Sequence, residues 1–328
     1  MTKRNHILGI LLLAAGLLAG CSHDDPEVRP AQDEIAVHTG VTSMQKRIIP
    51  INNDAALQTK ALKIEAYFHG TTTAYIPATK MVYDEGAWKF WSNGEPGEQV
   101  HYYWPLDGAV YNPTSDNITY SSLDFVGYCP FDAPAYITPG AYSAVSGVSF
   151  SCDMSGYMTL ASQAAMPEYL IAVLPEQTKA TQTAAGGALP LSFKHPLALV
   201  KFVITAASGT HVQINSISIA NLHTGGACSY NGTAMTWGAY TGSGTMEIAQ
   251  TLKTGETTET GEVAVIPADY GEKYLTVNAT WDDWSNVTIS DYGANVTFNW
   301  EPGHSYTYNL TLDKNGLKVD AAKFTEQW

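Results

Sequence analysis

Short stretches that alternate apolar and polar residues run through most of the chain and predict β-strands. Residues 62–68 (LKIEAYF) alternate until the last position, and Gly70 ends the run. Residues 75–83 and 88–91 flank the acidic turn DEG at 84–86 and predict a hairpin. Further strands are predicted at 100–104, 123–128, 168–174, 191–193, 197–205, 212–219, 262–266, 275–281, 287–290, 296–300, 306–312 and 317–328.

The strands are short and numerous, and no stretch has the periodicity of a long amphipathic helix. This pattern predicts an all-β fold made of two β-sandwiches. Residues 178–188 (TKATQTAAGGA) are small and polar and are predicted to link the domains. We therefore expect an N-terminal arm at 21–60, one sandwich at 61–187, with a Ser-, Gly- and Tyr-rich excursion at 134–166, and a second sandwich at 188–328.

The first twenty residues, 1–20, have the features of a signal peptide. Lys3 and Arg4 precede an apolar run at 7–19 that is too short to span a membrane. The sequence LAGC at 18–21 matches a bacterial lipobox, so Cys21 is the predicted lipidation site. The acidic SHDDPE that follows resembles the surface-export signal of Bacteroidota lipoproteins. We expect a surface-exposed lipoprotein held to the outer membrane by its lipid.

Composition narrows the classes of partner. The chain has 17 basic and 31 acidic residues, a net charge of -14, and such a surface repels a phosphate backbone, so no nucleic-acid partner is expected. Its 45% of hydrophobic residues can build real cores, which excludes a wholly disordered chain.

Cysteine and histidine positions predict neither a metal site nor a cofactor. The nine histidines include no i,i+4 pair, and no CxxC occurs. If Cys21 is acylated, Cys129, Cys152 and Cys228 remain, an odd number that allows at most one disulfide. A Cys129–Cys152 pair and three small buried thiols are both consistent with the sequence.

Catalytic motifs do not emerge either. Neither a phosphate-binding glycine loop nor a nucleophile elbow occurs. The carboxylates Asp282, Asp283 and Glu301 have no spacing that singles them out for glycoside hydrolysis, and neighbouring residues in a strand point to opposite faces. We expect a protein that is not an enzyme.

Tryptophans are the remaining candidates for ligand binding. Exposed aromatic rings can stack on the apolar faces of sugars, whereas buried rings stabilise the core of a sandwich. The glycan-stacking candidates are Trp88, Trp91, Trp281 and Trp284, and core packing is the alternative interpretation for each.

Several motifs occur in an order that resembles a known family. YYWP at 102–105 is followed by LDFVGYCP at 123–130, then by LSFKHPLA at 191–198 and VIP at 265–267. Near the end come Trp300, Gly303, Tyr306 and Tyr308. Together with the lipobox, this order is similar to that of the fimbrillin-like lipoproteins of Bacteroidota, the shaft and accessory subunits of type V pili. The residues Val126 and Gly127 replace a more aromatic pair of the family pattern.

The resemblance implies two tandem transthyretin-like β-sandwiches and assembly by strand exchange. In that family an Arg-specific protease removes the N-terminal arm, and a strand of the next subunit fills the groove that is opened. Arg47 is then the expected cleavage site, although a basic pair in a linker is also common. Residues 317–328 are the candidate donor strand, the alternative being an ordinary last strand of its own domain. The expected pocket-filling residues are Leu317, Val319, Ala321 and Phe324.

The resemblance thus implies a structural or adhesive subunit of a surface fimbrium, a type V pilus. Its partners would be other fimbrial subunits, in a homo- or heteropolymer, and a host or bacterial adhesion target. The alternative is a monomeric cell-surface lipoprotein that binds glycans through exposed aromatics. The sequence leaves open whether the subunit belongs to the shaft, the anchor or the tip.

Overall fold

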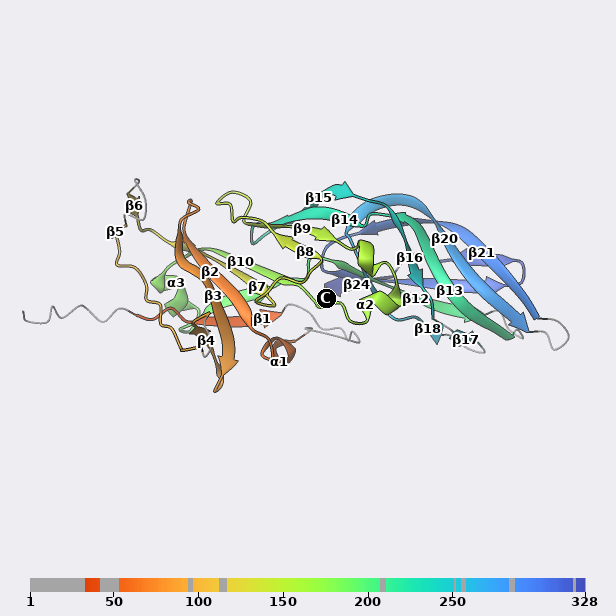
Figure 1. The fold of residues 1–328 in the computed structure, drawn as a ribbon, viewed down its shortest axis with the longest axis horizontal. Helices are drawn as coiled ribbons and strands as arrows, with labels where there is room; N and C mark the ends of the chain where they lie inside the picture. The colour runs from red at the N-terminus through yellow and green to blue at the C-terminus, as the bar shows by residue number, and fades with distance from the viewer. Residues whose placement is uncertain are drawn as a thin grey trace, which may run out of the picture. The chain divides into compact units, whose positions relative to one another are not determined.

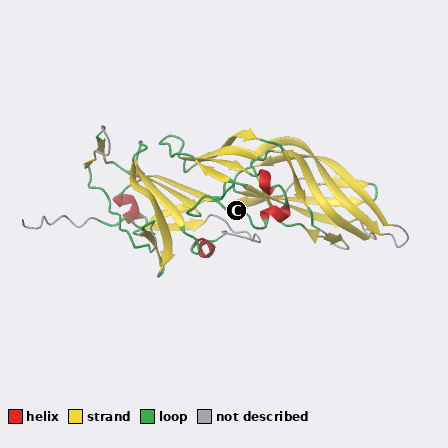
Figure 2. Ribbon diagram, in the orientation of Figure 1, coloured by secondary structure: helices red, strands yellow, loops and turns green. Residues whose placement is uncertain are grey.

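The computed structural model describes residues 33–41, 53–93, 97–111, 117–206, 211–250, 252–254, 258–282, 287–320 and 323–327. By its internal contacts the chain divides into residues 1–32, outside these ranges, and one compact unit, Asp33–Trp328. Strands dominate the described part, and the helices in it are single short turns (Figure 2). The predicted all-β class is therefore confirmed.

The N-terminal part of this unit is built on a five-stranded antiparallel sheet (Figure 1). Its strand order is β10 (Leu170–Gln177), β7 (Leu123–Cys129), β2 (Leu62–Phe68), β3 (Ala74–Asp84) and β4 (Ala87–Trp91). The predicted hairpin at 75–91 is thus present as β3 and β4. A separate pair, β1 (Val37–Val41) and β11 (Leu189–Phe193), is parallel, and the helix α1 (Asp54–Leu57) contacts β1. The small hairpin β5 (Val110–Tyr111) and β6 (Ile118–Thr119) completes this part.

Two larger sheets form the C-terminal part. The first has the order β18 (Thr258–Glu259), β12 (Ala198–Ala206), β22 (His304–Asp313) and β23 (Gly316–Val319), with β19 (Val263–Val265) on β12 and β24 (Lys323–Gln327) on β22. The second has the order β16 (Gly244–Ile248), β13 (His211–Leu222), β20 (Ala268–Asp282) and β21 (Val287–Trp300), with β17 (Leu252–Thr254) on β13. Buried residues of both sheets share one core, as in a sandwich.

A further sheet joins strands from distant parts of the sequence. Its order is β15 (Met235–Thr241), β14 (Gly225–Tyr230), β9 (Val148–Asp153) and β8 (Ile137–Pro139). The predicted excursion at 134–166 therefore supplies two strands to a sheet with a hairpin from 225–241. It also contains the 3₁₀ turn η1 (Ser155–Tyr157) and the helix α2 (Leu160–Gln163).

Strand β7 is buried along its whole length, on both faces of its sheet. Leu123 and Phe125 belong to the core of the N-terminal part, whereas Val126 and Tyr128 point into a separate core. That separate core also contains residues of β9, β14 and the start of β12. Strands on both sides of the predicted boundary at 187/188 thus share one apolar cluster, and the division into two tandem domains stays a prediction.

Two local predictions differ from the structure. Residues 178–188 contain a short capped helix, α3 (Lys179–Ala184), where a flexible linker was expected. The Thr178 hydroxyl accepts the N–H of Thr181 at 3.2 Å, which satisfies a free helix-end donor. Residues 100–104 do not form the expected strand: they contain one isolated bridge, between Tyr103 and Glu34, with backbone hydrogen bonds from Ile35 to Tyr102 and from Trp104 to Asp33.

Candidate assembly site

The residues 33–41, which we call the N-terminal segment, are held by backbone hydrogen bonds along their whole length. From Val37 to Val41 the segment is strand β1, paired in parallel with β11. Before β1, the N–H of Ile35 donates to the Tyr102 carbonyl at 2.7 Å, and the N–H of Trp104 donates to the Asp33 carbonyl at 3.0 Å. The segment is therefore incorporated into the fold as a strand.

One face of the N-terminal segment is part of the N-terminal core. Ile35, Val37 and Thr39 are only 2%, 5% and 2% exposed, whereas His38 between them is exposed. Full burial of an aliphatic side chain stabilises a fold by about 1.5–3 kcal/mol. Loss of the segment would uncover an apolar groove whose lining includes Leu191 and Phe193.

Strand β11 packs tightly on β7 beneath this groove. A Cβ atom built on Gly127 would lie 2.8 Å from Phe193 Cζ and 3.0 Å from Leu191 Cδ2. A glycine in a strand often marks such a close approach. This contact is a physical reason for Gly127, one of the two positions at which the sequence departs from the aromatic family pattern.

A buried glutamine of α3 clamps the N-terminal segment. The Gln182 Oε1 atom accepts the N–H of Ala36 at 3.1 Å and the indole N–H of Trp104 at 3.0 Å. Its Nε2 atom donates to the Glu34 carbonyl at 2.9 Å. One side chain thus satisfies two backbone groups of the segment and the Trp104 indole, and its loss would leave buried polar groups unpaired.

Several exposed polar contacts surround the segment. Lys179 forms an ion pair with Asp33, and His101 Nδ1 lies 2.6 Å from Glu34 Oε1. The N–H of Val41 donates to Asp54 Oδ1 in α1 at 3.0 Å. Exposed ion pairs contribute about 0–1 kcal/mol each, so the buried contacts determine how firmly the segment is held.

The fit of the segment is imperfect at Thr39. Its hydroxyl is buried and has no hydrogen-bond partner among the described residues. The similarly buried Thr79 hydroxyl, in contrast, contacts the Pro77 carbonyl at 2.7 Å and the Tyr102 hydroxyl at 2.9 Å. An unpaired buried hydroxyl costs about 1–3 kcal/mol. A strand with an apolar side chain at this place would fit the groove better.

The candidate donor strand lies on its own sheet in this chain. Leu317 and Val319 belong to β23, which pairs with β22 and packs half-buried against the C-terminal core. Phe324 is in β24, where its backbone pairs with that of Tyr306. Ala321 lies outside the described residues. Use of this tail as a donor would require β23 and β24 to leave β22.

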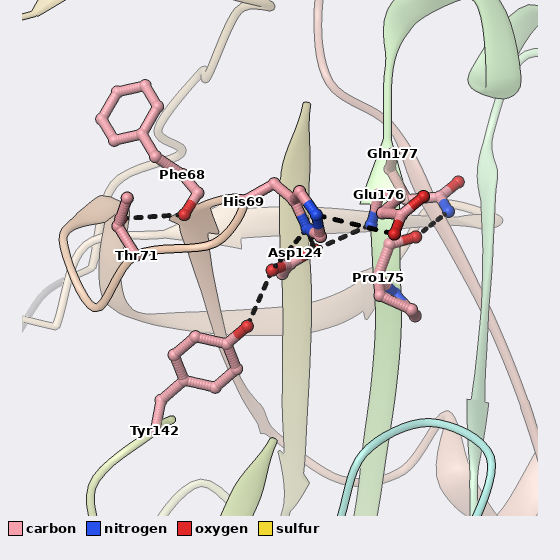
Figure 3. A network of polar contacts seen from close by, with 8 residues as sticks. All are labelled: Phe68, His69, Thr71, Asp124, Tyr142, Pro175, Glu176 and Gln177. Carbon is pink, nitrogen blue, oxygen red and sulfur yellow. Dashed lines mark hydrogen bonds and ion pairs between the residues drawn. The ribbon is translucent and has the colours of Figure 1, made fainter. Parts of the chain in front are cut away.

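A buried carboxylate forms a network that the sequence analysis did not identify. Asp124, 2% exposed, accepts the Tyr142 hydroxyl at 2.8 Å, the N–H of Glu176 at 2.7 Å and His69 Nδ1 at 2.9 Å (Figure 3). The burial of Tyr142, together with its bond to this carboxylate, raises its pKa. The network joins the turn after β2, the loop before β9 and the irregular end of β10, so its role is to fix these loops.

The four tryptophans proposed for sugar stacking have different surroundings. Trp88 and Trp91 are half-buried on β4, and Trp88 packs edge-on against Tyr83 with ring centroids 5.5 Å apart. Trp281 is 3% exposed in the C-terminal core, so its ring offers no free face to a ligand. Trp284 lies outside the described residues, as do Cys21 and Arg47.

The three cysteines that the structure describes are free and buried. Burial raises the pKa of both Cys129 and Cys152 to about 12 and also raises that of Cys228. Such thiols stay protonated and behave as small apolar side chains. The structure therefore agrees with the second of the two sequence-based interpretations.

The described part of the chain has one further cluster of buried titratable side chains, at His195 and Glu168. No group of three or more His, Cys, Asp or Glu side chains there is arranged to hold a metal ion. None of its helices has the length and apolar character needed to cross a membrane. The buried side chains of His195 and Glu168 lie with Nδ1 and Oε1 2.9 Å apart, next to a cavity that Lys194 and His304 also line.

The arrangement of strands and the order of motifs match a described family. A family model described as fimbrillin-like matches residues 69–328. The chain belongs to the fimbrillin-like family. The matched range begins just after β2 and includes all the later strands of the described structure.

Solved structures share the fold of this fimbrillin-like chain. A candidate cell adhesion protein from Bacteroides uniformis has 18% identity and a TM-score of 0.50, and the match covers 90% of this chain and 99% of that one. Another from Bacteroides ovatus has 12% identity and a TM-score of 0.51, covering 91% and 98% of the two chains. A search of curated proteins finds no match to this chain.

Proposed function

We propose that this fimbrillin-like chain is a surface-exposed subunit of a type V pilus, with a structural or adhesive role and no catalytic one. Membership of the family supports a place in the fimbrium, with other fimbrial subunits as partners. The names of the similar solved structures support a role in adhesion to a host or bacterial target. Lipidation at Cys21 would anchor the chain in the outer membrane before assembly.

Subunits would assemble by exchange of strands at the groove under the N-terminal segment. One observation carries this proposal: residues 33–41 are buried as a strand, and Arg47 follows only six residues after Val41. A cut after Arg47 would turn the segment from a tethered strand into a separate ligand that can dissociate, because its effective concentration falls. The apolar groove would then accept a strand from a second subunit.

The tail at 317–328 would supply that strand. Leu317 and Val319 are half-buried in β23, at the end of the sheet order β18-β12-β22-β23. Leu317 and Val319 are thus only partly removed from water in this chain, while insertion would bury them in a groove made for Ile35 and Val37. A donor strand with an apolar side chain at the place that Thr39 occupies would also leave no unpaired hydroxyl there.

The test uses the chain from Ser22 and an Arg-specific protease. We expect a new N-terminus at Ile48, loss of residues 22–47, and a ladder of oligomers in size-exclusion chromatography and in gels run without boiling. The variant Arg47→Ala should stay uncut and monomeric. A variant that ends at residue 316 should be cut normally yet remain monomeric.

The outcomes separate the steps of the proposal. A chain cut at Arg47 that loses the segment but never forms oligomers would contradict strand exchange. A ladder formed by the variant that ends at residue 316 would retain strand exchange but exclude the tail as the donor.

A further inference from the structure

The outer face of the sheet β13-β20-β21 has a chain of hydrogen-bonded amide and carboxylate side chains. Asn215 Nδ2 donates to Asn278 Oδ1 at 2.7 Å and to the Thr280 hydroxyl at 2.9 Å. Asn278 Nδ2 in turn donates to Asp291 Oδ1 at 2.7 Å. The core residues of β20 alternate with these positions, so the network lies on the side away from the core.

Asn215 is placed in this network by a β-bulge. The register of β13 against β20 shifts between Ile214 and Ser216, so Asn215 has no opposite residue. A bulge re-aims the side chain of the extra residue, and here it directs the amide across the sheet toward β20. The donors and acceptors of the three strands are thereby held in fixed positions.

An exposed tyrosine borders the network. Tyr274 is 56% exposed, and a Cβ atom built on Gly293 would overlap its hydroxyl group. The phenol therefore lies directly over Gly293. Gly293 pairs with Thr276, and the next pair on the same face is Asp291 with Asn278, which belongs to the network. Successive pairs on one face are about 7 Å apart, so the ring and the network lie within the span of a short oligosaccharide.

We propose that this surface, made of Asn215, Tyr274, Asn278, Thr280 and Asp291, is a binding site for neutral carbohydrate. Amide and carboxylate groups can hydrogen-bond to neighbouring hydroxyl groups of a sugar as donors and acceptors. The apolar face of a sugar ring can pack against a tyrosine ring that is already fixed in place. This inference does not depend on strand exchange, because no residue of the surface belongs to the groove or to the tail.

The charge of the surface selects the class of glycan. Asp291 is the only acidic residue among its five members, and the exposed Glu272 lies on the same face two positions before Tyr274. Carboxylates repel sialylated, sulfated and phosphorylated sugars. The site should therefore prefer neutral hexose and N-acetylhexosamine chains over the same chains that carry an acidic group.

The experiment measures binding of the intact chain from Ser22 to an array of neutral oligosaccharides printed beside their sialylated and sulfated forms. We expect binding to neutral glycans that Tyr274→Ala weakens roughly tenfold or more, through loss of the stacking face. Asp291→Asn keeps the shape of the side chain, so it should retain neutral binding and reduce the discrimination against acidic forms.

The matched control is Tyr240→Ala, which removes another exposed tyrosine, 38% exposed, from the strand β15. It should leave glycan binding unchanged, and circular dichroism of each variant checks that it folds. An absence of neutral glycan binding, a preference for acidic glycans, or neutral glycan binding that Tyr274→Ala leaves unaltered would overturn the proposal.

Discussion

The N-terminal segment and strand β23, the first strand of the C-terminal tail, are attached in different ways. The N-terminal segment at 33–41 buries Ile35, Val37 and Thr39 and is clamped by Gln182. Strand β23, which β24 follows along the chain, lies at the end of its sheet order with Leu317 and Val319 only half-buried. Loss of the segment would therefore open the core at Ile35 and Val37, whereas the described apolar residues of β23 are already partly in water. This difference supports our proposal that the groove is the acceptor and the tail the donor.

The largest expected difference concerns the apolar residues of the two strands. Ile35→Ala should lower the free energy of unfolding by about 3 kcal/mol, because it leaves a cavity in a closed core. Leu317→Ala should cost less than about 1 kcal/mol, since its side chain is already partly in water. Urea denaturation of both variants provides the comparison, and equal losses would contradict the assignment of roles.

The clamp offers a sharper comparison, because the chain contains a second buried glutamine in a similar setting. Gln163 of α2 binds the backbone of Ala264 through both ends of its amide, at 2.5 and 2.8 Å. Gln182→Leu and Gln163→Leu should each lower the free energy of unfolding by about 2 kcal/mol. Only Gln182→Leu should accelerate hydrogen exchange at 34–36 and hasten the loss of the cut segment.

If the two glutamine variants release the segment at the same rate, general destabilisation explains the effect. Gln182 would then not be a specific clamp of the N-terminal segment.

A smaller effect of opposite sign is expected at Thr39. Thr39→Val removes a buried hydroxyl without a partner in the described structure and should raise the free energy of unfolding by about 1 kcal/mol. The same change at Thr79 breaks two contacts and should lower that free energy by about 1 kcal/mol. Thermal denaturation measures the change in stability of both variants. A lower stability of Thr39→Val would contradict the claim that the buried Thr39 hydroxyl is unsatisfied.

The smallest effect concerns the exposed ion pair between Lys179 and Asp33. Lys179→Ala should change the free energy of unfolding by less than about 0.5 kcal/mol and should leave the rate of segment release unaltered. A large effect in 0.15 M salt would mean that charge, and not burial, holds the segment in place.

The sequence predicted the strands well where alternation was regular, as in β2 and β13, because one buried face imposes a period of two. It missed α3, since small polar residues such as those at 178–188 look alike in a linker and in a capped helix. It could not place β1 on β11 because a parallel pairing between residues 37 and 189 leaves no local signal. The Thr-x-x-Thr pattern at 178–181 was the one available indication of the helix.

For the candidate assembly site, the sequence analysis named a cleavage residue and a donor strand, both from the family resemblance, but not the segment at 33–41 or the residues that hold it. Arg47 and the tail remain predictions that the resemblance implies. Gln182 and Asp124 were not predicted, because a buried polar residue is recognisable only once its partners are known. Trp281 belongs to the core, since it occupies an inward position of β20. Gly127 and Gly293 illustrate the same limit, because the rings that cover them come from other strands.

Hydrogen exchange at β11, Leu189–Phe193, before and after cleavage with an Arg-specific protease tests the central claim most directly. The amides of this strand should be protected in the intact chain and exposed in the cut monomer that has lost residues 33–41. They should become protected again in oligomers. Protection of β11 that persists in the cut monomer without the segment would contradict the account, because the groove would then not need a strand to fill it.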